Sequence, residues 1–304
     1  MTTVLLTGGA GQVGKEIQRA PWAAGVRLVA PSRSEVDLTD AAAVHAAVAE
    51  AEPDVIVNCA AYTRVDDAED EPDAAMALNA SAVAALAEAA DAVDALLVHL
   101  STDYVFDGAK PEPYVETDPV NPLGVYGRSK VAGEEAAATA RRSVTLRTSW
   151  LYGALGANFV ATMLRLAGER DEIGVVDDQH GCPTAAADLA VAIGTVIDRA
   201  LGSGSGSAAD GPTLAPLYHL AAPDEASWYE LAVAAFDASA LGFGGVCRPL
   251  TTAEYPTRAR RPRNSRLDCS AIARDLGVVL PSWRRSLPTV VAELEEQHRE
   301  FEPD

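Results

Sequence analysis

Two short motifs in the middle of the chain carry side chains that could exchange a proton with a substrate. Tyr126 and Lys130 stand four residues apart, where a helix is expected to begin, and that spacing puts both on one helix face. A nearby ammonium favours the ionised form of a phenol, so we expect the pKa of Tyr126 to fall toward neutrality. Thr102, just after the apolar run 96–98, could hold the same substrate oxygen. The predicted acid–base set is therefore Thr102, Tyr126 and Lys130.

A Tyr-x-x-x-Lys spacing is common, and by itself it describes an exposed helix equally well. The glycine-rich segment near the N-terminus gives it more weight. The short apolar run Val4–Thr7 is followed by Gly8-Gly9-Ala10-Gly11-Gln12-Val13-Gly14 and then by a helix-compatible stretch. Glycines at these positions let the backbone turn tightly and approach a pyrophosphate at the N-terminus of the next helix. The expected cofactor contacts in this loop are Gly8, Gly11, Gln12, Val13 and Gly14.

Strand-like and helix-like segments alternate through the first half of the chain. Apolar runs at 4–7, 27–30, 55–57, 96–100 and 144–147 read as strands, and helices are expected at 41–51 (with Asp40 as N-cap), 72–92 and 126–140. Strands separated by single helices predict an α/β fold with a doubly wound parallel sheet of the Rossmann type. Residues 1–150 would form this dinucleotide-binding domain, to which later segments could return.

Residues 151–304 would form a smaller lobe that binds the substrate. Helices are expected near 157–168, 185–201, 227–240 and 287–301, with a strand at 217–220. The Gly/Ser segment at 202–207 predicts a flexible surface loop. A cleft between this lobe and the sheet would hold the substrate.

The residues after the second and third strands bear on which dinucleotide is bound. NAD-specific folds place an acid after the second strand, but here the segment 31–34 contains Arg33 and no acid. Arg33 could pair with a 2′-phosphate, which favours NADPH, with NADH as the alternative. Asp37 and Leu38 would lie near the adenine. The remaining expected cofactor contacts follow the third strand and are Ala60, Ala61 and Tyr62.

Composition excludes several other classes of protein. The chain has 304 residues, 48% of them hydrophobic, and a formal charge of −20, which argues against nucleic-acid binding. It contains no apolar run of membrane-spanning length and no basic N-terminal signal region, so we expect a cytoplasmic protein without a membrane partner. The four cysteines have no metal-ligand spacing, which predicts reduced thiols and no metal site.

An arginine-rich segment stands out against this acidic background. Arginines occupy positions 258, 260, 261, 263 and 266, close to Asn264. Guanidinium groups bind phosphate oxygens through paired hydrogen bonds, so the segment predicts a site for a substrate diphosphate. The alternative is a solvated charged surface.

Taken together, these motifs resemble the extended short-chain dehydrogenases/reductases that act on nucleotide sugars. Within that group, several stretches are similar to the dTDP-4-dehydrorhamnose reductase family. The stretches are Gly11-Gln12-Val13-Gly14, Ser101-Thr102-Asp103-Tyr104-Val105-Phe106, Arg147-Thr148-Ser149-Trp150, Asp178-Gln179-x-Gly181-x-Pro183-Thr184 and Arg261-Pro262-x-Asn264-Ser265-x-Leu267.

The resemblance implies NADPH-dependent reduction of the 4-keto group of dTDP-4-dehydro-L-rhamnose to dTDP-L-rhamnose. Tyr126 would donate a proton to the C4 oxygen, and Lys130 would also hold the nicotinamide ribose. Thr102 would hydrogen-bond the reacting oxygen, with Asp103 contacting the sugar and Trp150 lining its pocket. Arg261 and Asn264 would bind the rest of the substrate. Some members of the family form homodimers, so the resemblance is compatible with a homodimer, but the sequence does not determine the oligomeric state.

Two other functions share part of this pattern. An epimerase or 4,6-dehydratase would use the same threonine, tyrosine and lysine, but dehydratases carry a second acid where this chain has Tyr104. A non-catalytic, NADP-binding regulatory subunit is the other alternative, and the intact set of Thr102, Tyr126 and Lys130 argues against it. The histidines His99, His180 and His219 show no ligand spacing and are interpreted as structural.

Overall fold

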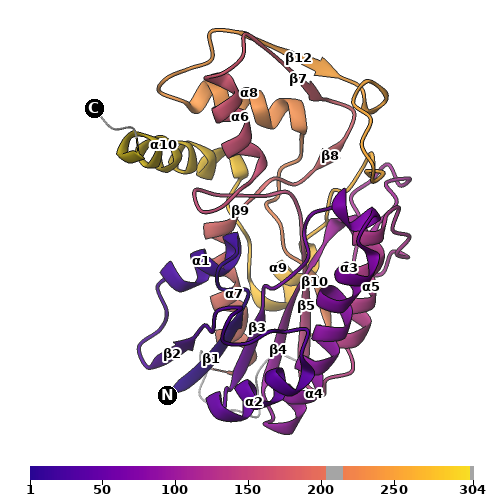
Figure 1. Cartoon of the computed structure of the whole chain (residues 1–304), viewed down its shortest axis with the longest axis vertical. Helices are drawn as coiled ribbons and strands as arrows, with labels where there is room; N and C mark the ends of the chain where they lie inside the picture. The colour runs from indigo at the N-terminus through magenta and orange to yellow at the C-terminus, as the bar shows by residue number, and fades with distance from the viewer. Residues whose placement is uncertain (203–214, 302–304) are drawn as a thin grey trace.

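The computed structural model describes residues 1–202 and 215–301, and its centre is a parallel sheet (Figure 1). The sheet has six strands, and in spatial order they are β10 (Leu217–His219), β5 (Ser143–Thr148), β4 (Leu96–Thr102), β3 (Val55–Asn58), β1 (Thr2–Thr7) and β2 (Val26–Val29). The order runs outward from β1 to β2 and then in the other direction from β3 to β10. This reversal makes the sheet doubly wound and confirms the expected Rossmann-type fold.

Helices cover both faces of the sheet. One face packs against α1 (Gln12–Arg19), α7 (Ala186–Ala200) and α9 (Ser270–Leu276), and the other against α2 (Ala41–Ala51), α4 (Ala82–Ala92) and α5 (Val125–Ala137). Successive side chains of β1 alternate between the two cores, with Leu6 in the first and Leu5 in the second. Because both faces are buried, these strands read in the sequence as unbroken apolar runs.

The helix expected at 72–92 is divided in the structure. It consists of α3 (Pro72–Met76), a single π-helical turn η2 (Ala77–Ser81) and α4. Within η2, the Asn79 side chain accepts a hydrogen bond from Tyr62 N (2.7 Å) and donates to Tyr62 O (3.1 Å) and Ser129 Oγ (2.9 Å). These tertiary contacts explain the π-turn, because the wider turn directs Asn79 toward α5.

The remaining elements form a second group, at the top of Figure 1. Its helices are α6 (Phe159–Ala167), α8 (Trp228–Ala238) and α10 (Trp283–Phe301). Its short paired strands are β7 (Glu172–Val176) with β12 (Val246–Leu250), β6 (Leu151–Tyr152) with β9 (Thr184–Ala185), and β8 (His180–Gly181) with β11 (Ala226–Ser227). Ser227 and Glu230 form a capping box that starts α8.

The two groups of elements are interleaved along the chain. The helices α7 and α9 and the strand β10 all follow residue 150, yet they pack on the sheet. The expected return of later segments to the first domain therefore has a counterpart in the fold. The expected Gly/Ser loop lies, from Ser203 to Ser207, outside the described residues. Among residues 1–202 and 215–301, no helix is both long and apolar enough to cross a membrane.

Candidate active site

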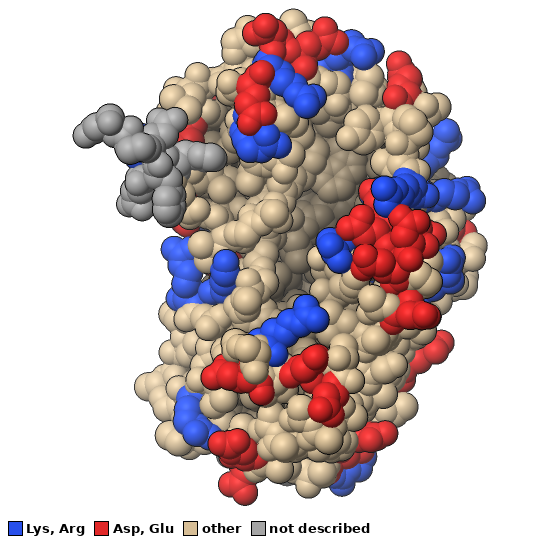
Figure 2. All heavy atoms as spheres, in the orientation of Figure 1, with Lys and Arg blue, Asp and Glu red and all other residues tan. Residues whose placement is uncertain are grey.

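The carboxyl ends of the parallel strands bring the expected site residues to one edge of the sheet. Gly8 follows β1, Arg33 follows β2, Ala60 follows β3, and Thr102 is the last residue of β4. Parallel doubly wound sheets bind their ligands at this edge. Figure 2 shows the molecular surface hollowed between the sheet and the group of elements above it, and the visible walls of the hollow are mostly uncharged.

The glycine loop has the shape that a dinucleotide requires. Gly8 has φ +74°, and a Cβ on it would lie 2.5 Å from Ala60 N; a Cβ on Gly14 would lie 2.2 Å from the Gly8 carbonyl oxygen. Only glycine fits either position. In the described part of the chain, no side chain caps the first turn of α1, and Gln12 Oε1 is buried without a hydrogen-bond partner. The free backbone N–H groups fit a bound pyrophosphate, and the Gln12 oxygen could accept a hydrogen bond from a hydroxyl or amide group of a ligand.

The other expected cofactor residues lie around this loop. Arg33 and Asp37 are exposed, and Leu38 is partly buried against the core under α2. The pKa of Asp37 is lowered, mainly by hydrogen bonds from Thr39 and to a smaller extent by the charge of Arg33. The side chains of Asp37 and Arg33 therefore lie near one another. Beyond β3, Ala60 and Ala61 are partly buried, and the Tyr62 hydroxyl donates to Glu71 (2.7 Å).

The catalytic candidates meet between the end of β4 and the start of α5. A Cβ on Gly127 would lie 2.3 Å from the Tyr104 carbonyl oxygen, so this glycine lets α5 approach the segment after Thr102. The rings of Tyr104 and Tyr126 meet edge to face, with centroids 6.1 Å apart. One turn further along α5, Lys130 is 2% exposed and its Nζ donates to the Leu100 carbonyl oxygen at 2.6 Å. The structure thus brings Thr102, Tyr126 and Lys130 together.

The ionisation of this set differs from the expectation. Burial raises the pKa of Tyr126 to about 12, a hydrogen bond with Thr102 acts in the lowering direction, and the charge of Asp103 raises the pKa further. Lys130 is not among the causes, and its amine nitrogen is instead directed at the Leu100 carbonyl. Burial in turn lowers the pKa of Lys130 to about 8. The phenol therefore stays protonated at neutral pH, which suits a proton donor.

Asp103 points into the protein beside Thr102. It is 2% exposed, and its carboxylate accepts hydrogen bonds from Thr102 Oγ1 (3.0 Å) and Ser149 Oγ (2.9 Å). Burial raises the pKa of Asp103 to about 6. The structure thus gives Asp103 a second role besides the expected sugar contact, because it fixes the orientation of the Thr102 hydroxyl.

Two residues that were expected to contact the substrate, Trp150 and Asn264, make extensive contacts within the protein. Trp150 has φ +46° and is 8% exposed, and its ring stacks on Trp228 at a centroid distance of 3.5 Å. A Cβ on Gly181 would overlap this indole, at 2.3 Å. Asn264 Nδ2 donates to the carbonyl oxygens of residues 110 (2.6 Å) and 112 (2.8 Å), and its Oδ1 accepts from Arg266 Nε (2.8 Å). All the polar atoms of the Asn264 side chain therefore brace the loops around it.

The arginine segment is paired with carboxylates. Arg261 makes two hydrogen bonds to Asp66, both of 2.6 Å, Arg258 Nη1 lies 2.5 Å from Asp70, and Arg266 pairs with Glu225. Acidic and basic groups accordingly gather side by side on the surface near α3 (Figure 2). The expected cluster of positive charge is thus largely neutralised, and a substrate phosphate would have to compete with Asp66 for Arg261.

The short turn that begins at Asp66 and includes η1 (Asp67–Glu69) also reaches the catalytic helix. Asp66 Oδ1 accepts from Ala259 N (2.9 Å), and Glu69 Oε1 accepts from Val125 N (2.7 Å), the first residue of α5. We call residues 66–69 the acidic turn. No local pattern in the sequence indicates this role, because the partners of the acidic turn lie far along the chain.

Two clusters of buried polar side chains beneath the site were also not predicted from the sequence. Glu134 on α5 and Arg147 on β5 form a bidentate ion pair (2.8 and 2.6 Å), and Ser101 Oγ donates to the same carboxylate at 2.5 Å. Asn58 and His99 are in contact with each other and lie beneath Lys130. The available signal was the presence of polar residues within strands that are otherwise apolar.

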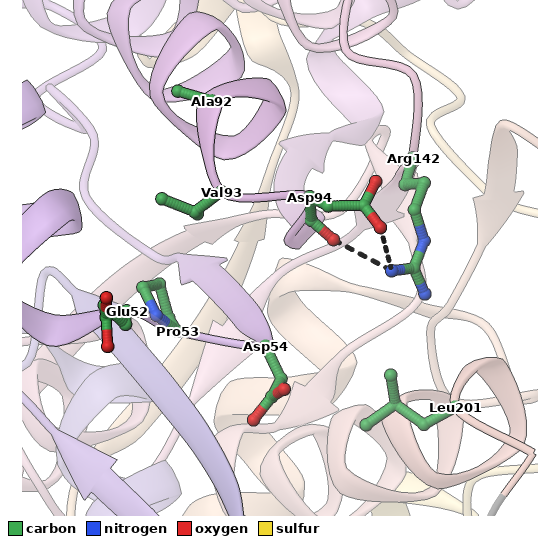
Figure 3. Close-up of a pocket in the computed structure, with 8 residues that line it drawn as sticks. All are labelled: Glu52, Pro53, Asp54, Ala92, Val93, Asp94, Arg142 and Leu201. Atoms are coloured by element: carbon green, nitrogen blue, oxygen red, sulfur yellow. Dashed lines mark hydrogen bonds and ion pairs between the residues drawn. The ribbon is translucent and has the colours of Figure 1, made fainter.

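A separate pocket of about 550 Å³ lies at the opposite edge of the sheet (Figure 3). Its lining residues are Glu52, Pro53, Asp54, Ala92, Val93, Asp94, Arg142 and Leu201. Arg142 Nη1 donates to the Asp94 carbonyl oxygen at 2.9 Å. Because Asp54 and Arg142 precede β3 and β5, this pocket faces the amino ends of the strands and is remote from Thr102 and Tyr126.

Comparison with known proteins extends over nearly the whole chain. Residues 1–296 match the family described as RmlD substrate binding domain. A dTDP-4-dehydrorhamnose reductase of Sinorhizobium fredii is 47% identical over 88% of this chain and 89% of its own length. That of Escherichia coli K12 is 41% identical over 96% of this chain and 97% of its own. A dTDP-4-dehydrorhamnose reductase from Bacillus anthracis, solved in complex with NADP, has a TM-score of 0.87 and 37% identity, covering 96% of this chain and all (100%) of that one.

Proposed function

The chain belongs to the RmlD substrate binding domain family, and on that premise we propose that it is an NADPH-dependent oxidoreductase acting on a nucleotide sugar. The reaction is reduction of the 4-keto group of dTDP-4-dehydro-L-rhamnose to give dTDP-L-rhamnose. The observation that carries the proposal is the meeting of Thr102 with Tyr126 and Lys130 at the sheet edge that also bears the glycine loop. Relatives that cover nearly the whole chain bear the name of this reductase.

The residues around the glycine loop fit an NADP cofactor. Gly8 and Gly14 leave room that a side chain would fill, and Gln12 Oε1 is an unpaired acceptor for a hydroxyl or amide donor of the cofactor. When bound, NADPH supplies the hydride for C4. Arg33 is the candidate for holding the 2′-phosphate, because it is exposed and lies just beyond β2.

Tyr126 would supply the proton. Its pKa of about 12, raised by burial, keeps the hydroxyl protonated over the physiological pH range. A general acid must hold its proton until charge develops on the acceptor oxygen. Lys130 lies one helical turn away, with its Nζ on the Leu100 carbonyl oxygen, and would return a proton to Tyr126 after the transfer.

Thr102 would hold the C4 oxygen in place for Tyr126. Contacts with Asp103 and with Tyr104 N fix the position of Thr102 Oγ1 before the substrate enters. Its single proton, which points at Asp103 in this structure, would turn to the C4 oxygen when the substrate binds. Asp103 and Ser149 behind it complete the support.

A dehydratase is disfavoured by the residue at position 104. Elimination of water needs an acid beside the threonine and the aspartate, but Tyr104 occupies that place and burial raises the pKa of its hydroxyl. A phenol held in this state is a poor partner for proton abstraction at neutral pH.

The direct test is oxidation of NADPH, followed by absorbance, on addition of the keto-sugar nucleotide generated in situ. We expect Tyr126→Phe to lower kcat by about 10²–10⁴-fold while NADPH still binds, because it removes only the proton donor. The matched control is Tyr255→Phe, since Tyr255 is exposed. Turnover near the wild-type rate in Tyr126→Phe would refute the assignment of the acid, and no NADPH oxidation by the wild-type chain would refute the function.

A further inference from the structure

A row of polar side chains crosses the sheet just below the candidate active site. Thr7 of β1, Asn58 of β3 and His99 of β4 are partners in register across neighbouring strands. All three are at most 4% exposed. They lie on the face that α5 covers, where a Cβ on Gly133 would come within 3.4 Å of His99 Nε2. The proposed reaction assigns no role to this row.

Two donors fix the orientation of the Asn58 amide. Thr7 Oγ1 donates to Asn58 Oδ1 at 2.7 Å, and Ala60 N donates to the same oxygen at 3.1 Å. The amide nitrogen of Asn58 must therefore be the atom that faces His99 Nδ1, at 3.1 Å. Because an amide NH₂ group only donates, His99 Nδ1 must accept.

This hydrogen bond determines where the proton of His99 lies. Burial, together with the charge of Lys130, lowers the pKa of His99 well below its usual range, so the ring is neutral. A neutral imidazole that accepts at Nδ1 carries its proton on Nε2. His99 Nε2 lies 3.5 Å from Lys130 Nζ. The ring thus directs an N–H at the lysine nitrogen.

Burial is the largest influence on the charge of Lys130, and it lowers the pKa. The charge of Glu134, on the same helix, acts in the opposite direction, but that carboxylate is itself bound by Arg147 and Ser101. Burial raises the pKa of the Cys59 thiol to about 12 and that of Tyr126 to about 12, so both are neutral. Lys130 itself donates to a carbonyl oxygen, which either protonation state can do.

We propose that His99 is a positioning residue for Lys130: Asn58 holds the imidazole with its proton on Nε2, and that N–H favours the neutral amine of Lys130 over the ammonium. An ammonium has no lone pair to accept this N–H, whereas an amine has one. Lys130 then exchanges its proton at near-neutral pH. The purpose of this exchange rests on the proposed function. There, Tyr126 gives its proton to the substrate, and a lysine that releases its own proton readily can donate it to the Tyr126 oxygen.

The lysine can be observed directly, because the chain has lysines only at positions 15, 110 and 130. Labelling with lysine carrying ¹³C at Cε gives one signal for each, and Lys15→Arg and Lys110→Arg assign them. The pH dependence of the third signal gives the titration midpoint of Lys130, which we expect near 8, the value to which burial lowers its pKa.

His99→Phe tests the direction of the effect. If Nε2 carries the proton, its loss should raise the Lys130 midpoint by about half to one pH unit, the equivalent of one hydrogen bond. Thr145→Val is the matched control, because Thr145 is the buried neighbour of His99 in register on β5. Its midpoint should equal that of the wild type. A fall or no change in His99→Phe would overturn the proposal.

A second measurement uses the unaltered protein and so does not depend on the variant folding. Long-range ¹H–¹⁵N correlations identify which ring nitrogen of His99 is protonated, and we expect Nε2. Protonation of Nδ1 would overturn the proposal. Neither experiment needs turnover, so a chain that passes both yet does not oxidise NADPH with the sugar nucleotide would refute only the proposed function.

Discussion

Neutralising Glu134 should destabilise the fold far more than its place on a helix exposed on one side suggests. The side chains of Glu134 and Arg147 are only 11% and 4% exposed, and two hydrogen bonds of 2.8 and 2.6 Å join them. In Glu134→Gln, an NH₂ group replaces one carboxylate oxygen and the guanidinium of Arg147 remains buried without an opposite charge. Breaking a buried pair from one side costs about 3–5 kcal/mol.

The loss should be measured as the change in the free energy of unfolding in urea. At roughly 2 °C per kcal/mol for a large chain, the melting temperature should fall by about 6–10 °C. The matched control is Glu135→Gln, because Glu135 is the next residue on α5 and is exposed. That variant should stay within about 0.5 kcal/mol of the wild type. Equal, small effects of the two substitutions would refute the argument that the buried charge of Arg147 depends on Glu134.

Two further predictions concern the ligands. Arg33→Ala should weaken NADPH binding more than NADH binding, because a charge-assisted hydrogen bond to the 2′-phosphate is lost. The ratio of the two dissociation constants, measured by fluorescence titration, should change by roughly 10- to 100-fold. Equal losses for the two cofactors would show that Arg33 does not bind the 2′-phosphate. Arg261→Ala should raise KM for the sugar nucleotide and leave KM for NADPH unchanged in steady-state kinetics, because Arg261 would bind the substrate diphosphate. The reverse pattern would assign Arg261 to the cofactor. No change in either KM would mean that Arg261 only pairs with Asp66.

The sequence was sufficient for features that depend on neighbours along the chain. The glycine loop could be predicted because a positive φ at Gly8 and a close approach at Gly14 are local requirements of the turn. Asp40 could be predicted as the N-cap of α2 for the same reason, and it accepts from the N–H groups of Ala42 and Ala43. The alternation of strands and helices likewise gave the doubly wound sheet.

Features that depend on distant partners could not be predicted in this way. Asp66 and Arg261 are 195 residues apart, so the sequence indicated an arginine cluster without its counter-charges. The π-turn at Asn79 depends on contacts with Tyr62 and Ser129. The predicted direction of the Tyr126 pKa shift was wrong for a related reason. Spacing on a helix predicts that Tyr126 lies near Lys130, but the pKa of Tyr126 is determined mainly by burial, which depends on the rest of the fold.

The acidic turn has a consequence for anyone who would build chimeras from relatives of this chain. Asp66 binds Arg261 of the arginine-rich segment, and Glu69 binds the first N–H of the helix that carries Tyr126. Four consecutive residues therefore connect the segment proposed to bind the substrate with the helix proposed to supply the proton. A chimera that exchanges residues 258–266 should therefore exchange residues 66–69 as well. Otherwise the arginine of the donor protein would lack the carboxylate that binds it in its own structure. The smallest transferable unit is thus two segments whose paired residues, Asp66 and Arg261, are 195 positions apart in the sequence.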